Sequence, residues 1–461
     1  MEEERQQQRE LLRAVAEHAA AYLGSLDSRP VFPRVGVDEL RARLGGPLPE
    51  GPQEPKEVID ALVAAADPGI VSIPGGRYFG FVIGGSVPAA LAADWLTSTW
   101  DQNAGLYAAG PSASVVEEVC LGWLRDLLGL PGHASGAFVT GCQMAHVTAL
   151  AAARWEVLRR AGWDVNARGL AGAPPVRVLT GDLRHVTVDR ALRLLGVGAD
   201  AIESVPTDEA ARMRPDLLAD ALAAKAGPTI VCAQAGEVNT GAFDPLDPVA
   251  DACAEAGAWL HVDGAFGLWA AATPGLRHLV AGAERADSWA TDAHKWLNVP
   301  YDSGIAFCAH PEAHRAAMSV HASYLVQADD GGPRDEVDWT PEFSRRARGF
   351  PIYAALRSLG RSGVAALVER CCAHARGFAD RLAADGAEIL NDVVLNQVLV
   401  SFGDDARTDA VLAAVRDGGT CFMSGTTFRG RRAMRISVSN WQTTEADVDA
   451  SVAAILAAAR R

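Results

Sequence analysis

The chain has 461 residues, 49% of them hydrophobic and 21% charged, a composition typical of a globular protein with two or three packed units. Its formal net charge of −15 argues against nucleic acid or an anionic membrane surface as a partner, because both bind concentrated lysine and arginine. Since the eight cysteines lack metal-ligand spacing and the N-terminus is charged and polar, we expect reduced thiols, no metal site, no membrane span and a cytoplasmic protein.

Residues 1–109 predict a helical and linker segment. Apolar residues recur at helical spacing between Leu11 and Leu23, so one stripe of this helix must be covered. We expect the cover to come from a second subunit. The stretch from Pro30 to Pro55 is rich in proline and glycine and predicts an extended linker.

Residues 110–350 alternate short apolar runs with longer helical stretches, which predicts an α/β unit with a mainly parallel sheet covered on both faces. The predicted strands are residues 136–140, 177–180, 229–233, 258–262, 288–291 and 304–308, and the predicted helices are residues 144–160, 187–195, 214–225 and 248–256. Residues 351–461 predict a long helix and a small C-terminal α+β unit, with strands at 389–390, 397–401 and 433–438 and helices at 408–417 and 446–459.

Two side chains at predicted strand ends indicate pyridoxal-phosphate (PLP) chemistry. Asp263 ends the sequence His-Val-Asp, and Lys295 stands in Asp-Ala-His-Lys-Trp after a later strand. A lysine amine can bond the PLP aldehyde, and a carboxylate facing the pyridine nitrogen keeps that nitrogen protonated. Lys295 lies in an apolar run where a charge without a function would be costly. An isolated aspartate would more often be a strand-end cap, so the pair carries the inference.

Two further elements lie where open α/β sheets bind ligands. Thr140 to Met144 follow a strand and open a helix, and backbone amides at a helix N-terminus can hold a phosphate. Such turns are also common without a ligand. His185 follows the strand at 177–180, where a flat imidazole can lie against a cofactor ring, although single histidines are often structural.

The succession of motifs resembles the group II PLP-dependent decarboxylases, which include aromatic-L-amino-acid decarboxylases, glutamate decarboxylases and bacterial relatives. The resemblance extends from about Tyr22 to the C-terminus and rests on the segments TGCQ, AGEVNTGAFDPL, HVDGAFG, DSWATDAHKWLNVPYDSG and RGFPIYAALRSLG. It implies PLP fold type I, the aspartate-aminotransferase type, with a seven-stranded large domain. It also implies a homodimer with active sites at the subunit interface.

The resemblance implies roles for individual residues. Lys295 matches the family's Schiff-base lysine, Asp263 the partner of the pyridine nitrogen, and His185 the histidine stacked on the ring. Ala265 falls where a small residue packs on the other ring face. Tyr324 matches the loop tyrosine that returns a proton to the substrate carbon after carbon dioxide leaves.

The phosphate site departs from the family pattern. Cys142 and Gln143 match phosphate-loop positions, but Asp292 stands where the family commonly has Asn or Ser. A carboxylate repels a phosphate, so either Asp292 points away or Thr291 or His294 holds the phosphate. The sequence Gly-Glu-Val at 236–238 also replaces the family's Gly-Thr-Thr and removes expected hydroxyl ligands.

Three residues are candidates for binding the substrate. Phe81 and Ile83 lie in a segment that resembles the one lining the family's side-chain pocket, although aromatic-rich segments are often core. Arg435 is placed to meet a carboxylate from the small unit, and an interface salt bridge is the alternative.

The resulting hypothesis is a PLP-dependent carboxy-lyase that removes the α-carboxylate of an L-amino acid and gives an amine and carbon dioxide. One alternative is a PLP aminotransferase or an aldehyde-forming oxidative deaminase; Tyr324 favours decarboxylation, because aldehyde-forming relatives carry phenylalanine there. The other is a non-enzymatic binding or regulatory subunit, against which the retained lysine argues. The identity of the amino acid stays open between aromatic, acidic and unusual side chains.

Overall fold

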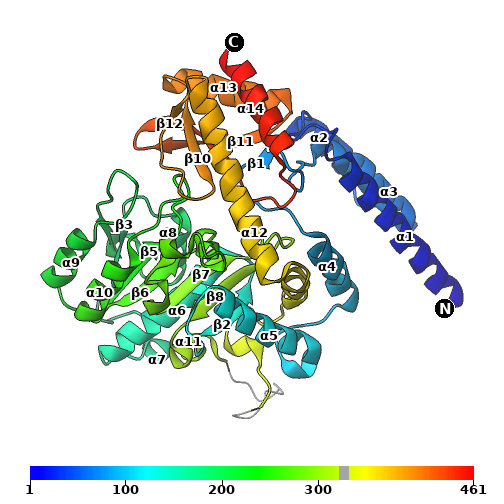
Figure 1. Cartoon of the computed structure of the whole chain (residues 1–461). Coiled ribbons are helices and arrows are strands. Elements are labelled where there is room, and N and C mark those ends of the chain that lie inside the picture. The colour runs from blue at the N-terminus through cyan, green and yellow to red at the C-terminus, as the bar shows by residue number, and fades with distance from the viewer. Residues whose placement is uncertain (321–331) are drawn as a thin grey trace.

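The computed structural model describes residues 1–320 and 332–461, and its largest element is a seven-stranded sheet (Figure 1). The strand order is β2-β8-β7-β6-β5-β3-β4, and only β8 runs antiparallel to its neighbours β2 and β7. The strands are β2 (Ser135–Val139), β3 (Arg177–Gly181), β4 (Ile202–Val205), β5 (Thr229–Gln234), β6 (Trp259–Asp263), β7 (Ser288–Asp292) and β8 (Gly304–Cys308). This confirms the predicted fold class.

Helices cover both faces of the large sheet, as its strands require, since all of them except the edge strand β4 are fully buried. Neighbouring residues such as Ile230 and Val231 enter different core clusters, because successive side chains of a strand point to opposite faces. One face carries α6 (Cys142–Arg160), α8 (Val186–Leu194) and α11 (Pro311–Met318), and the other carries α9 (Pro215–Ala224) and α10 (Leu246–Ala256).

A second sheet of five strands has the order β1-β11-β12-β10-β9. Its strands are β1 (Tyr78–Phe79), β9 (Glu388–Ile389), β10 (Gln397–Ser401), β11 (Phe422–Phe428) and β12 (Arg431–Ser437), flanked by α13 (Asp405–Gly418) and α14 (Glu445–Ala459). The long helix α12 (Gly349–Ala384) leads from the large sheet to the small one (Figure 1). The division at residues 109 and 350 stays a prediction, and β1 adds an N-terminal strand to the C-terminal sheet.

The N-terminal region contains α1 (Glu2–Ser25), α2 (Val37–Leu44), α3 (Pro55–Ala66) and α4 (Pro88–Trp100). The prediction of an extended linker from Pro30 to Pro55 is wrong for residues 37–44, which form α2. Figure 1 shows α1 and α3 side by side, projecting away from the rest of the molecule, and neither contains a buried residue. Among the described residues, no helix combines the length and apolar character needed to cross a bilayer.

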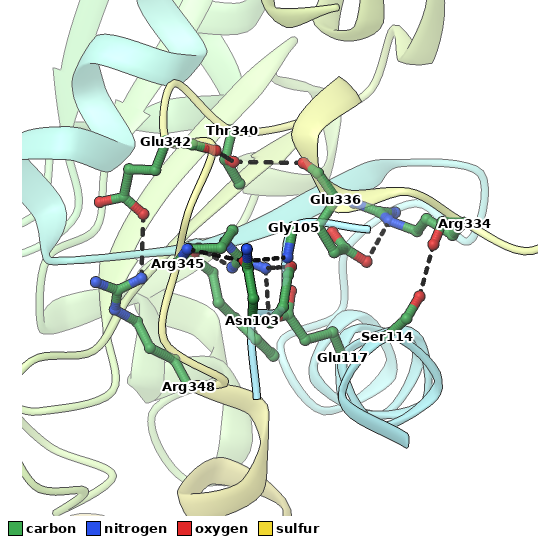
Figure 2. Close-up of polar contacts among 12 residues, drawn as sticks. Asn103, Gly105, Ser114, Glu117, Arg334, Glu336, Thr340, Glu342, Arg345 and Arg348 are labelled. Carbon is green, nitrogen blue, oxygen red and sulfur yellow. Dashed lines mark hydrogen bonds and ion pairs between the residues drawn. The ribbon is translucent and has the colours of Figure 1, made fainter. Parts of the chain in front are cut away.

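A buried ion pair anchors the segment that follows the undescribed residues (Figure 2). Arg345 Nη1 lies 2.7 Å from Glu117 Oε1, a residue of α5 (Pro111–Leu127), and both side chains are fully buried. Arg345 also donates to the carbonyls of Ala104 and Phe138 at 2.7 and 2.6 Å. Burial raises the pKa of Glu117, whereas the charge of Arg345 lowers it and favours the ionised pair. The pair therefore ties α5 and β2 to the chain around residue 345.

Replacing Arg345 with methionine should destabilise the protein by about 3–5 kcal/mol, because Glu117 would remain buried without its partner. The measurement is the midpoint of urea unfolding followed by far-UV circular dichroism. Arg361→Met, which breaks the exposed pair between Arg361 and Asp126, is the matched control and should change the midpoint little. An unchanged midpoint for Arg345→Met would show that the buried pair does not stabilise the fold.

Candidate active site

Lys295 lies in the turn that follows β7, a central strand of the large sheet. Its Nζ is 2.8 Å from Asp292 Oδ2. Burial opposes the charged amine, but the Asp292 carboxylate raises the pKa of Lys295 above its ordinary value. A side chain at Gly84 would place its Cβ 1.8 Å from the Lys295 carbonyl oxygen, so only glycine permits this approach of the N-terminal segment.

Asp263 ends β6, the strand paired with β7, and its carboxylate is buried. Oδ1 accepts from the Ala265 amide at 3.1 Å, and Oδ2 lies 3.4 Å from His146 Nε2. Burial alone would favour the neutral acid. The neighbouring His146, His185 and Lys295 nevertheless lower the pKa of Asp263 well below its ordinary value, so this side chain is a carboxylate.

The turn that precedes α6 binds the carboxylate of Asp292. Asp292 Oδ1 accepts from the Cys142 amide at 2.6 Å, so Asp292 points toward the turn, and the alternative that it points away is wrong. His294 accepts from the Ser303 amide through Nδ1 at 3.0 Å, which leaves Nε2 facing Asp292 Oδ1 at 3.4 Å. A phosphate near this turn must therefore share its surroundings with Asp292.

His185 caps the N-terminus of α8, directly beyond β3. Its Nδ1 accepts from the Thr187 amide at 3.4 Å and contacts Thr187 Oγ1 at 2.7 Å. In the neutral ring the proton is therefore on Nε2. Burial lowers the pKa of His185, which favours this neutral form.

These side chains surround a cavity of about 320 Å³. Nine of the predicted site residues line it: Phe81, Cys142, Gln143, His185, Asp263, Ala265, His294, Lys295 and Arg435. Thr291 and Ile83 do not line the cavity. Thr291 Oγ1 donates to the Ala265 carbonyl at 3.4 Å, and the Ile83 carbonyl accepts from Ser439 Oγ at 3.2 Å. Tyr324 lies outside the described residues.

The structure also adds lining residues that the sequence did not indicate, among them Val82, Thr187, Gln234, Val238 and Phe266. Their positions follow from tertiary folding, since each stands in an ordinary strand, turn or loop sequence. Glu237, by contrast, turns into its own loop, where it accepts from the amides of Asn239 and Thr240 at 3.0 and 2.8 Å. It therefore replaces the family's hydroxyl ligand with a structural carboxylate.

The cavity fits a phosphorylated pyridine aldehyde. Gln143 Oε1, Gln234 Nε2 and Arg435 Nε are buried lining atoms without a hydrogen-bond partner among the described residues. A Cβ at Gly304 would come within 2.3 Å of the Gly141 backbone, so small residues keep the strand and the phosphate turn in close contact. Lysine, carboxylate and stacking imidazole match the aldehyde, ring nitrogen and ring face of PLP.

A seven-stranded, mainly parallel sheet with this lysine, aspartate and histidine around one cavity defines a PLP-dependent enzyme of fold type I. The pyridoxal-dependent decarboxylase conserved domain matches residues 43–403, and the chain belongs to this family. It is therefore a PLP-dependent carboxy-lyase that removes the α-carboxylate of an amino acid.

Named relatives include both decarboxylases and an aldehyde-forming enzyme. The chain is 30% identical over 346 residues to an aromatic-L-amino-acid decarboxylase of Bacillus atrophaeus, covering 74% of this chain and 70% of the relative. The Oryza sativa TDC solved with PLP and tryptamine has a TM-score of 0.91 and 25% identity, covering 98% of this chain and 97% of that chain. A phenylacetaldehyde synthase of Arabidopsis thaliana is 25% identical over 466 residues, covering 96% of this chain and 94% of the relative.

Proposed function

We propose that this decarboxylase acts on an aromatic L-amino acid and releases the corresponding amine. The proposal rests on Phe81, a large apolar side chain that lines the cavity and is 58% exposed. Phe81 and the β-branched Val82 have φ values of 56° and 58°, a strained left-handed pair of the kind that occurs where function requires it. Val82, Val238 and Phe266 extend the apolar wall, and the named relatives with aromatic substrates support the proposal.

In this proposal the residues divide the work among the parts of the cofactor. Lys295 binds the aldehyde, Asp263 keeps the ring nitrogen protonated, and His185 and Ala265 contact opposite ring faces. The phosphate site comprises the predicted ligands that line the cavity, Cys142, Gln143 and His294, whereas Thr291 is buried outside it. When bound, the protonated ring accepts the electron pair of the breaking carbon–carboxylate bond.

Arg435 is proposed to bind the substrate's carboxylate. It projects from β12 into the cavity, and its Nε has no hydrogen-bond partner among the described residues. Burial lowers the pKa of its guanidinium, while the Glu237 carboxylate acts in the opposite direction. A buried, incompletely paired guanidinium favours a planar anion, for which its fork geometry is suited. Ile83 stays a predicted substrate contact on its sequence resemblance alone.

A product assay with a panel of amino acids tests the substrate class. The purified enzyme with PLP should convert one or more aromatic L-amino acids to equal amounts of amine and carbon dioxide, while the D-enantiomers and the acidic amino acids stay unreacted. Amine from glutamate or aspartate, with none from the aromatic panel, would overturn the aromatic assignment.

Tyr324→Phe should redirect the product from amine to aldehyde. Without the phenol, no acid at this position returns a proton to the α-carbon, and dioxygen can take the electrons instead. Substrate, dioxygen and water then give aldehyde, carbon dioxide, ammonia and hydrogen peroxide. Amine and peroxide are measured together, and His321→Gln is the control for a second titratable side chain close to Tyr324 in the sequence. Amine at the wild-type rate without peroxide would exclude Tyr324 as the acid.

We also propose a cytoplasmic homodimer with shared active sites. Large apolar side chains are exposed on α1, α3 and α4: Leu12, Leu23, Val58, Leu62, Trp95, Leu96 and Trp100. A second copy that covers them would bury the projecting N-terminal helices. All eight cysteines are buried and unpaired, which suits a reducing compartment. Light scattering that gives the mass of a single chain would contradict the dimer.

A further inference from the structure

Behind the Asp263 carboxylate, four buried side chains form a continuous hydrogen-bonded chain. Trp259, His261 and Asp263 alternate along β6, so their side chains share the face toward α6. Trp259 Nε1 donates to Ser288 Oγ at 2.9 Å, and Ser288 Oγ contacts His261 Nδ1 at 2.9 Å. His261 Nε2 lies 2.9 Å from His146 Nδ1, and His146 Nε2 lies 3.4 Å from Asp263 Oδ2.

The donor and acceptor in each hydrogen bond of this chain follow from the end at Trp259. An indole N–H can only donate, so Ser288 Oγ accepts from Trp259. Among the described residues the Ser288 hydroxyl has no other bonded acceptor than His261 Nδ1, so its own proton goes there. Burial lowers the pKa of His261 to about 3, so its ring is neutral and its single proton is on Nε2. That proton is donated to His146 Nδ1, which leaves the N–H of His146 on Nε2, toward Asp263.

We propose that His146 is a positioning residue of the decarboxylase: its Nε2–H, oriented by the chain from Trp259, holds Asp263 ionised through Oδ2 and orients Oδ1, which also accepts from the Ala265 amide, toward the cofactor's ring nitrogen. The proposal rests on the role given above to Asp263. His146 itself does not line the cavity and acts only through the carboxylate. Because both partners are buried, water cannot replace this hydrogen bond when it is removed.

The same place has the composition of a cation site, since ligating atoms of Cys142, His146 and Asp263 lie within 4.8 Å of one another. In the proposed arrangement the hydrogen-bonded chain occupies these atoms instead. A ring nitrogen that carries a proton cannot bind a metal, and both nitrogens of His146 are engaged, one as acceptor and one as donor. In this proposal the cluster therefore fixes which histidine nitrogens carry a proton.

Nuclear magnetic resonance of the cofactor-free chain tests the direction independently of activity. Long-range proton–nitrogen spectra of ¹⁵N-histidine protein should show His146 and His261 both protonated at Nε2 and unprotonated at Nδ1. The opposite tautomer at either ring would overturn the proposal. So would zinc found at one equivalent per chain in the purified protein.

Holoenzyme variants test the consequence. His146→Leu, with ¹⁵N-labelled PLP, should move the ring-nitrogen resonance toward the unprotonated value and lower kcat at least about tenfold with little change in KM. His146→Gln, whose amide nitrogen can still donate to Asp263, should recover most of both. The matched control is His314→Leu, since His314 is also a fully buried histidine but bonds Ser135 at 2.9 Å and lies outside the cavity. It should leave the resonance unchanged.

The outcomes separate this inference from the assignment of Asp263. If Asp263→Asn shifts the nitrogen resonance and His146→Leu does not, the role of His146 is wrong while the active site stands. If Asp263→Asn leaves the nitrogen protonated, the proposed role of the aspartate itself fails. An unfolded His146→Leu variant would leave the glutamine variant and the tautomer measurement to decide.

Discussion

Lys295→Ala will abolish turnover and the visible absorbance of the bound cofactor. In the proposed site the amine of Lys295 is the covalent attachment point, and no other lysine lines the cavity. The chain has only two other lysines, Lys56 and Lys225. Alanine variants at those two positions therefore provide a complete set of controls. Both variants should keep full absorbance and activity.

Borohydride reduction gives a second readout of the same prediction. Reducing the wild-type holoenzyme should fix the cofactor's mass on the peptide that contains Lys295, whereas the alanine variant should yield no labelled peptide. A label on Lys56 or Lys225, or turnover in Lys295→Ala without an added amine, would contradict the assignment of the active site.

Asp263→Asn should retain PLP but lose at least about tenfold in kcat. The carboxylate is ionised and buried, and an amide cannot supply the charge that keeps the ring nitrogen protonated. Loss of one charge-assisted interaction corresponds to roughly 1.4 kcal/mol or more, a factor of ten in rate. The measurements are kcat for the preferred amino acid and the equilibrium affinity for PLP.

Asp244→Asn controls for the loss of a buried carboxylate elsewhere. Asp244 accepts from the amides of Met213 and Gln234 at 2.6 and 2.7 Å and does not line the cavity. Its replacement should lower stability without lowering kcat per bound PLP. If Asp263→Asn stays within about twofold of the wild-type rate, another group protonates the ring nitrogen.

The sequence predicted those parts of the structure whose residues lie close together in the chain. Asp263 ends a short apolar strand, and Lys295 and His185 follow such strands. Because the carboxyl ends of parallel strands meet at one edge of a sheet, these positions alone predicted that the three residues lie at that edge. The sequence did not predict strands that lack a continuous apolar run. β4 is a half-exposed edge strand, and β11 contains Ser424, Gly425 and two threonines, a composition typical of a loop.

The missed residues of the site have a different cause. His146 stands in the second turn of α6, a helix that is buried nearly all round, where a histidine gives no periodic signal. Its significance depends on His261 and Ser288, which lie 115 and 142 positions further along the chain and meet it only in the folded sheet. Asp292 departs from the family pattern in the sequence, but its bond to the Cys142 amide forms only in the folded chain.

The pairing of β1 with β11 fixes the order in which the protein can be completed. Tyr78 and Phe79 are synthesised early, yet their partners Phe422 and Met423 leave the ribosome near the end of translation. Phe81 is two residues beyond β1, and Arg435 comes from β12, the strand beside β11. The large sheet can thus fold while the chain is still growing, whereas the wall of the cavity that combines both ends of the chain closes last. A nascent or C-terminally truncated chain would consequently carry Lys295 and Asp263 without Arg435 and without the finished wall of the cavity.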